Sequence, residues 1–200
     1  VRCLLDRLWT AMGHPRISES AVPASQLYLS TLKNAVHWSV KMISIDVLCD
    51  DVARHPAHAF HTATHLSNLL SVSEHLPVRE KAGQGLLRIA DKLSMDQLNE
   101  IVVDLTRELE TGQEEVSRYI PRYLGPLLCR LPHKELEESL TFLEDFVRTT
   151  SISSARAALL TLGVVLSELL RTGRGGDSLA SHVQGLLLTG VAHFDSPIHQ

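Results

Sequence analysis

The sequence predicts an all-α protein built from antiparallel helix pairs that repeat along the chain. One apolar spacing, with residues at offsets 0, 4, 8, 11 and 15, begins at Val78, again at Val116 and a third time at Ala155. This is the spacing of one stripe along an α-helix. A second spacing, with offsets 0, 4, 7 and 11, begins at Leu98 and at Leu136, between those segments. The predicted unit is therefore a first helix and a second helix, repeating every 38 or 39 residues.

Residues 1–54 are expected to form irregular helices that belong to the same array. A short form of the first-helix stripe occupies residues 1–12, and a connection rich in glycine, proline and serine follows it. A long helix is predicted over about 24–53, with its stripe at Leu32, Val36, Val40, Ile43 and Val47. His55-Pro56 should end this helix, because the residue before a proline is pushed away from the α region.

Residues 55–200 are predicted to hold the regular helical repeats. A second-type helix over about 57–74 carries apolar residues at offsets 0, 4, 7 and 11, beginning at Ala59. Pro77 suits the first turn of the next helix, where no internal hydrogen bond is lost. Ser94 and Gln97 form the pattern of a capping box that opens the helix of Leu98.

The helix pairs that begin near Glu114 and at Ala155, the second and third of the regular repeat, follow with less regular connections. The first-type helix from about Glu114 contains Pro121 and Pro126, which are expected to bend or interrupt it. The next first-type helix should begin at Ser151 or Ser153. Its predicted stripe is Ala155, Leu159, Gly163, Leu166 and Leu170.

The glycine-rich segment 171–177, RTGRGGD, is predicted to be a plain surface loop, because it lacks a phosphate-binding Walker pattern and no strand precedes it. After this loop the second-helix spacing recurs from Leu179. Ser196-Pro197-Ile198 then reads as the opening of a further repeat. The chain is accordingly expected to be part of a longer array, truncated at its C-terminal end.

Three features together resemble HEAT repeats. They are the period, the prolines inside a first helix, and an arginine near the start of each first helix, namely Arg79, Arg118 and Arg156. Armadillo-like repeats stay open as the alternative, because a regular aspartate between helices and a regular arginine in the second helix are missing. The resemblance implies a right-handed α-α superhelix, a HEAT-like solenoid, in which each pair touches its neighbours and the second helices line the concave face.

Charge differs between the two kinds of helix. The second-type segments 95–112 and 135–150 each carry five acidic residues and one arginine. The first-type segments that contain the stripes of Val78 and Val116 are net basic. We therefore expect a non-catalytic protein-interaction scaffold, or a regulatory segment of a larger protein, that binds a basic protein partner on the concave face. The predicted contacts are Glu100, Asp104, Glu108, Glu137, Glu138 and Glu144. The competing interpretation is that both faces are simply solvated.

A cluster of histidines supports a different class of function. His58, His61 and His65 lie at i, i+3 and i+7 of a predicted helix, so their imidazoles share one face and could hold a divalent metal. The alternative function is thus a metal-dependent hydrolase or metal-binding module. The pattern resembles that of HD-type phosphohydrolases, although the His-Asp doublet of that family is missing. A solvent-lining polar stripe and a pH-sensitive contact are the other readings of the same residues.

Composition excludes several other classes. A net charge of −4 argues against a general nucleic-acid surface, although the glycine-rich loop and the basic first helices leave local contact with phosphorylated ligands open. The cysteines are odd in number and far apart, which indicates free thiols and a cytoplasmic location. No uninterrupted apolar run reaches the roughly 20 residues that span a bilayer, so no membrane association is expected. Neither a catalytic motif nor a cofactor motif is present, and self-association through an exposed solenoid end is expected to be feasible.

Overall fold

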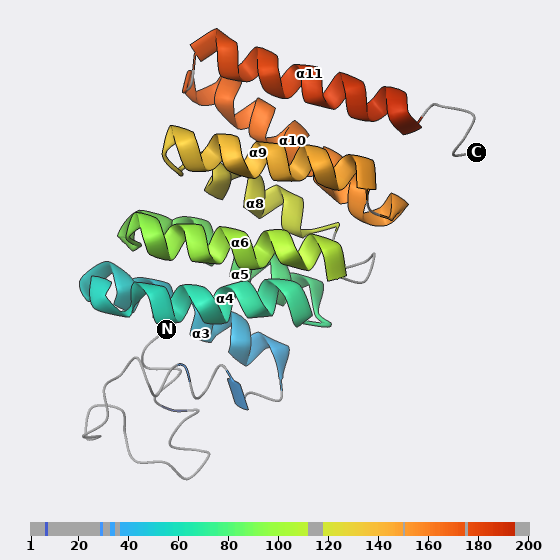
Figure 1. Cartoon of the computed structure of the whole chain (residues 1–200). Helices are drawn as coiled ribbons and strands as arrows, with labels where there is room; N and C mark the ends of the chain where they lie inside the picture. The colour runs from blue at the N-terminus through green and yellow to red at the C-terminus, as the bar shows by residue number, and fades with distance from the viewer. Residues whose placement is uncertain are drawn as a thin grey trace. The chain divides into compact units, whose positions relative to one another are not determined.

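The structure is a computed structural model of the chain, and it describes residues 37–111, 118–149, 151–174 and 176–194, together with Arg7, Leu29, Lys33 and Asn34. Every regular element in these residues is a helix (Figure 1), which confirms the predicted all-α class. The chain divides into two compact units, Val1–Ser94 and Met95–Gln200, and each is described by itself. The boundary predicted at residue 54 depends on a segment that lies mostly outside the described residues, and it stays a prediction.

In the first unit, α5 packs against both α3 and α4. The elements are α3 (Trp38–Arg54), the 3₁₀ turn η2 (Pro56–His58), α4 (Ala59–Val72), α5 (Leu76–Ile89) and the 3₁₀ turn η3 (Ala90–Lys92). The α3 helix ends at His55, whose φ of −130° and ψ of 77° are those of a residue held out of the α region by the proline that follows. Pro77 lies in the first turn of α5, as predicted.

The core of the first unit follows two of the predicted stripes. Ala59, Ala63, Leu66 and Leu70 of α4 are buried, and so are the five members of the stripe that begins at Val78. Leu32 and Val36 of the stripe predicted for α3 lie outside the described residues. Of its other members Val47 is buried as predicted, but Val40 and Ile43 are half-buried, and the buried side is formed instead with Ile45, Leu48 and Val52. The reason is that α3 carries apolar residues on more than one side, so spacing alone does not identify the inner face.

The three arginines that support the HEAT resemblance do not share one environment. Arg79 is buried, and its Nε donates a hydrogen bond to the carbonyl of Ser73, which ends α4, so it closes the turn between α4 and α5. Arg118 and Arg156 are exposed. The three arginines therefore have no common structural role.

In the second unit, α10 packs against all four other helices. The elements are α6 (Met95–Thr111), α8 (Ile120–Leu128), α9 (His133–Thr149), α10 (Ile152–Thr172) and α11 (Gly176–Phe194). Figure 1 shows α6, α9 and α11 in one layer of this unit, with α8 and α10 in the layer behind it. The layers correspond to the predicted second-type and first-type helices.

The two prolines of α8 have different positions. Pro121 is in the first turn, where it starts the helix, and Pro126 is inside it, two residues before the helix ends. The start predicted near Glu114 lies outside the described residues. Gly125 brings α8 close to α10, because an added Cβ would lie 2.5 Å from Cγ1 of Val164.

The stripe predicted for α10 is wrong by one residue. Of its members Ala155 is buried, but Leu170 is 68% exposed, and Leu159, Gly163 and Leu166 are half-buried. The buried stripe is Ser154, Ala158, Leu162, Val165 and Leu169. It has the same offsets and begins 38 residues after Val116, so the repeat is more regular than the apolar pattern indicated. The pattern misled because α10 is apolar on most of its surface.

The segment 171–177, predicted as a plain surface loop, belongs in part to helices, since α10 ends at Thr172 and α11 begins at Gly176. Gly173 and Arg174, which follow α10, are exposed as expected, and Arg174 also anchors the segment. Gly173, with a φ of 65°, takes the left-handed conformation that caps α10. The guanidinium of Arg174 then donates hydrogen bonds to the carbonyl of Cys129 and, at 2.7 Å, to that of Leu131. These carbonyls follow the end of α8, so the loop ties α8 to the turn between α10 and α11.

Within the described residues, α10 is also long and apolar enough, by length and composition alone, to cross a membrane. Its most apolar 18-residue window has a mean hydropathy of 1.4, and 44% of that window is buried. A helix packed among α8, α9 and α11 in a folded unit passes the same test. The expectation of no membrane association therefore stays a prediction.

Candidate protein-binding groove

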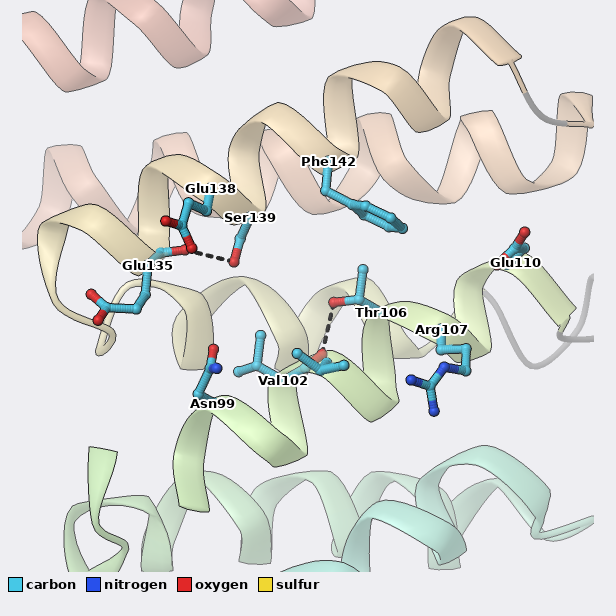
Figure 2. A pocket seen from close by; sticks show the side chains of 10 residues that line it. Asn99, Val102, Thr106, Arg107, Glu110, Glu135, Glu138, Ser139 and Phe142 are labelled. Carbon is cyan, nitrogen blue, oxygen red and sulfur yellow. Dashed lines mark hydrogen bonds between the residues drawn. The ribbon is translucent and has the colours of Figure 1, made fainter. Parts of the chain in front are cut away.

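A groove of about 400 Å³ lies in the second unit between α6 and α9. The side chains that line it come from these two helices only: Asn99, Val102, Val103, Thr106, Arg107, Glu110, Glu135, Glu138, Ser139 and Phe142. In Figure 2 the residue numbers along α6 and along α9 increase in the same direction, so the two helices flank the groove in parallel. We call this the α6–α9 groove.

The α6–α9 groove has an apolar floor that is partly open to solvent. Val102 is buried, whereas Val103 and Phe142 are 45% and 47% exposed. Figure 2 shows Phe142 reaching from α9 into the space above α6. Its ring stacks on Phe146, with centroids 5.6 Å apart and planes at 28°, which fixes its orientation. The groove thus presents an aromatic side chain whose outer face is uncovered.

The rim of the α6–α9 groove is mainly acidic. Three carboxylates line it, those of Glu110, Glu135 and Glu138, against one cation, Arg107. Figure 2 places Glu135 and Glu138 toward one end and Glu110 toward the other. Arg107 lies 3.6 Å from Asp104, an acidic residue outside the groove. The electrostatic character of the groove therefore favours a cationic ligand.

Two hydroxyl groups in the groove already donate hydrogen bonds within their own helices. Thr106 Oγ1 donates to the carbonyl of Val102 at 2.7 Å, and Ser139 Oγ donates to the carbonyl of Glu135 at 2.8 Å (Figure 2). Each oxygen can still accept a hydrogen bond. These hydroxyls, like the carboxylates, consequently suit a ligand that donates hydrogen bonds.

Of the acidic residues predicted on α9, one lies in the α6–α9 groove. Glu138 lines it, and its carboxylate is 3.7 Å from the ammonium of Lys134. Glu137 does not line the groove, and its carboxylate is 3.3 Å from His133 Nε2. Glu144 lies on the opposite flank of α9, in a second groove.

The acidic residues predicted on α6 lie on a different stripe from the groove. Glu100, Asp104 and Glu108 follow one another at intervals of four residues, and none of them lines the groove. Each successive residue of a helix is rotated by about 100°, so Asp104 and Glu108 are turned away from Val103 and Glu110, by roughly 100–160°, whereas Glu100 is one turn before Val103 and lies at the edge of the groove side. The charge pattern identifies α6 as an acidic helix, but spacing within one helix does not determine which of its sides faces α9.

The second groove has a volume of about 250 Å³ and lies among α9, α10 and α11. Glu144 and Arg148 line it and form an ion pair at 2.5 Å across one turn of α9. They follow Thr106 and Glu110 of the α6–α9 groove by 38 residues each. Equivalent positions of α6 and α9, one repeat apart, thus each line a groove.

The histidines predicted to form a metal site are divided between two clusters. His58 lies with Asp51 and His55, a group whose ligand atoms are all within 4.8 Å of one another. His61 and His65 pair with each other, edge to face, with ring centroids 4.8 Å apart. His58 belongs to the 3₁₀ turn η2, so it does not continue the helical face that the spacing i, i+3, i+7 assumed.

His65 is the more buried member of its pair. Burial, with smaller contributions from Lys33 and His61, lowers the pKa of its imidazole, and its Nε2 is buried without a hydrogen-bond partner. It is therefore neutral near pH 7. A site on His61 and His65 alone would offer two nitrogen ligands and no carboxylate.

Two of the three cysteines are described, and both are buried free thiols, as predicted. The Sγ of Cys49 donates to the carbonyl of Gly85 at 3.7 Å, and that of Cys129 donates to the carbonyl of Val165 at 3.8 Å. Burial raises the pKa of each thiol to about 11. Neither is poised for nucleophilic chemistry. Cys3 lies outside the described residues.

Phe142 was not among the predicted contacts, and Asp51 and His55 were not among the predicted metal ligands, although they adjoin the histidine cluster in the sequence. Phe142 is outside the buried stripe of Leu136, Leu140 and Leu143, and a large aromatic residue off the inner face of an amphipathic helix is a usable signal for a binding surface. Asp51 and His55 lie at i and i+4, a spacing that brings side chains together on a helix.

Comparison of the chain with protein-family models, with curated proteins and with solved structures gives no match.

Proposed function

We propose that this chain is a non-catalytic protein-binding module, whose α6–α9 groove takes a basic amphipathic helix from a partner protein. The observation that carries the proposal is the exposed pair Phe142 and Val103 beside the buried Val102, within a rim of three carboxylates and one arginine. Exposed apolar side chains bordered by charge are typical of interaction surfaces. Aromatic side chains are enriched among residues that dominate binding energy.

The shape of the α6–α9 groove supports a helical ligand. The lining residues of α6 run from Asn99 to Glu110, a rise of about 17 Å, or about three helical turns. An amphipathic helix could place apolar side chains at i and i+4 on Phe142 and Val103, and lysine or arginine toward Glu135, Glu138 and Glu110. The partner supplies the positive charge, because the chain itself carries a net charge of −4.

At the level of the fold we propose a HEAT-like α-solenoid that serves as a scaffold or a regulatory segment of a larger protein. Three findings within the second unit support this: the two layers of helices, the parallel course of α6 and α9, and grooves whose lining residues recur after 38 residues. A repeating groove suits extended partners, which could occupy more than one repeat.

The test is selection of peptide ligands from a displayed random library, followed by fluorescence-anisotropy titration of a synthetic peptide. We expect enriched peptides with lysine or arginine and large apolar residues at helical spacing. Raising the salt from about 0.05 M to about 0.3 M should weaken binding several-fold, because the rim charges are exposed. Phe142→Ala should weaken it about tenfold, as expected for loss of an aromatic anchor.

The matched variants are Glu138→Lys and Glu137→Lys, which make the same charge change at adjacent positions. Glu138 lines the groove and Glu137 does not. We expect Glu138→Lys to weaken the peptide at least tenfold and Glu137→Lys to change it by less than threefold. Equal effects of the two substitutions would mean that general charge, and not the groove, attracts the peptide. Failure to enrich any basic peptide would contradict the proposal outright.

A further inference from the structure

A carboxylate and two imidazoles meet at the corner between α3 and α4. Asp51 is 3% exposed, and its two oxygens have separate partners. Oδ1 lies 3.1 Å from Nδ1 of His55, and Oδ2 lies 3.2 Å from Nδ1 of His58. The side chains of His55 and His58 are 58% and 39% exposed, so the cluster has one buried side and one open side.

Local backbone structure brings these groups together. Asp51 and His55 are one turn apart at the end of α3, where side chains four residues apart are neighbours. Pro56 then turns the chain into η2, which returns His58 to the same carboxylate. The backbone N–H of His58 donates to the carbonyl of His55 at 3.0 Å, which holds the turn. Both histidines are therefore positioned independently of any ligand.

We infer that Asp51, His55 and His58 form a binding site for a divalent transition-metal ion, of which zinc is the best fit. A tetrahedral zinc ion with bonds of about 2.0–2.1 Å places its ligand atoms about 3.3 Å apart. His55 Nδ1 and His58 Nδ1 now form hydrogen bonds with the two different oxygens of Asp51, at 3.1 and 3.2 Å. One ligand atom from each of the three residues lies within 4.8 Å of the other two, so a bound ion would replace these hydrogen bonds after a small rotation of the side chains. Two imidazole nitrogens with one carboxylate oxygen suit zinc and its neighbours, whereas magnesium and calcium prefer oxygen ligands.

The surroundings contain one group that opposes a cation and one feature that favours it. Arg54 Nη2 is 3.9 Å from Asp51 Oδ1, and Arg54 Nε donates to the carbonyl of Asp50 at 3.2 Å. The side chain of Arg54 is 46% exposed, so water screens its charge. The site is at the C-terminal end of α3, where the helix dipole favours positive charge. Three protein ligands leave a fourth position for water on the open side. Zinc bound here would join the end of α3 to the start of α4.

The proposed zinc site, Asp51, His55 and His58, is different from the triad His58, His61 and His65 that the sequence indicated. His61 and His65 contact each other, and they are not members of the Asp51 group. The inference is also independent of the proposed groove, because its residues belong to the first unit and the groove belongs to the second. Either can therefore fail without the other.

The experiment is isothermal titration of the metal-free chain with zinc chloride, supported by the absorption spectrum of the cobalt-substituted chain. We expect one zinc per chain, and visible cobalt bands with the intensity of a four-coordinate site. His55→Ala and His58→Ala should each weaken zinc binding at least tenfold. Both side chains are partly exposed, so these variants should keep the helical circular dichroism of the parent.

The matched controls are His61→Ala and His75→Ala, which remove exposed histidines of the same unit outside the group. They should leave the zinc affinity within twofold. The absence of stoichiometric zinc binding would overturn the inference. So would binding that survives His55→Ala but is lost in His61→Ala, which would instead support the triad indicated by the sequence.

Discussion

Arg174 shows how one side chain decides whether a glycine-rich segment is a loose loop. Carbonyl groups beyond the last turn of a helix have no intrahelical donor. The guanidinium of Arg174 supplies donors to two such carbonyls, those of Cys129 and Leu131, across 45 and 43 residues of sequence. The pattern RTGRGGD predicted the turn, but it contained no information about a partner so distant.

Arg174→Ala should lower the free energy of unfolding by about 1–2 kcal/mol, because hydrogen bonds made by a charged group contribute roughly 1.5–3 kcal/mol and the exposure of Arg174 weakens them. Urea denaturation followed by circular dichroism measures this. Arg171→Ala is the control, because Arg171 is an exposed residue of the same segment whose ion pair with Glu168 lies on the surface. If the control lowered stability as much as Arg174→Ala, the anchoring role of Arg174 would be contradicted.

Cys49 and Cys129 should be unreactive in the folded chain. Burial raises the pKa of each thiol from 9.0 to about 11, so the thiolate fraction at pH 8 falls about a hundredfold. In a Cys3→Ser background, labelling by a disulfide reagent should be slow until denaturant is added. Rapid labelling of the folded chain would show that these thiols are open to solvent.

The same shift makes a prediction for stability at alkaline pH. Unfolded thiols lose their protons near pH 9, whereas the folded thiols keep theirs to about pH 11. The unfolded state therefore binds fewer protons in this interval, and the free energy of unfolding should fall as the pH rises from 9 to 11. Replacing both cysteines by alanine should reduce that slope, and an unchanged slope would assign it to other groups.

Among the helices, predictability depended on how sharply each one divides into a polar and an apolar side. In α6 and α9 charged residues flank a narrow stripe, and all the predicted members, from Leu98 to Leu109 and from Leu136 to Val147, are buried. The α10 helix is apolar nearly all round, so two neighbouring registers fit its sequence equally well. Packing of α10 against α8 determines which register is buried, and the local sequence of α10 contains no information about that contact.

The contact between α8 and α10 can be tested with two glycines. An alanine Cβ at position 125 would lie 2.5 Å from Val164 Cγ1 and 2.8 Å from its Cβ, so Gly125→Ala should destabilise the chain by about 1–3 kcal/mol. Position 163, in α10, has no atom within 4 Å of an added Cβ. Gly163→Ala should therefore be neutral or stabilise by up to about 1 kcal/mol, through helix propensity. Equal urea midpoints for the two variants would contradict this packing.

For the whole molecule, the regular period was readable from sequence and the candidate site was readable only in part. The repeat begins at Val78, Val116 and, after correction, Ser154, which are 38 residues apart. An acidic surface on the second helices was predicted, and Glu138 does line the α6–α9 groove. The groove itself depends on which flank of α6 faces which flank of α9, and spacing within one helix cannot determine that.

The central claim is that the α6–α9 groove binds a basic helix, and hydrogen exchange tests it most directly. The backbone amides of the chain would be compared with and without a saturating amount of the selected peptide. If the α6–α9 groove binds the peptide, exchange should slow in residues 99–110 and 135–142 and stay unchanged in the first unit. Protection confined to other segments, or no protection at saturation, would show that the groove is not the binding site.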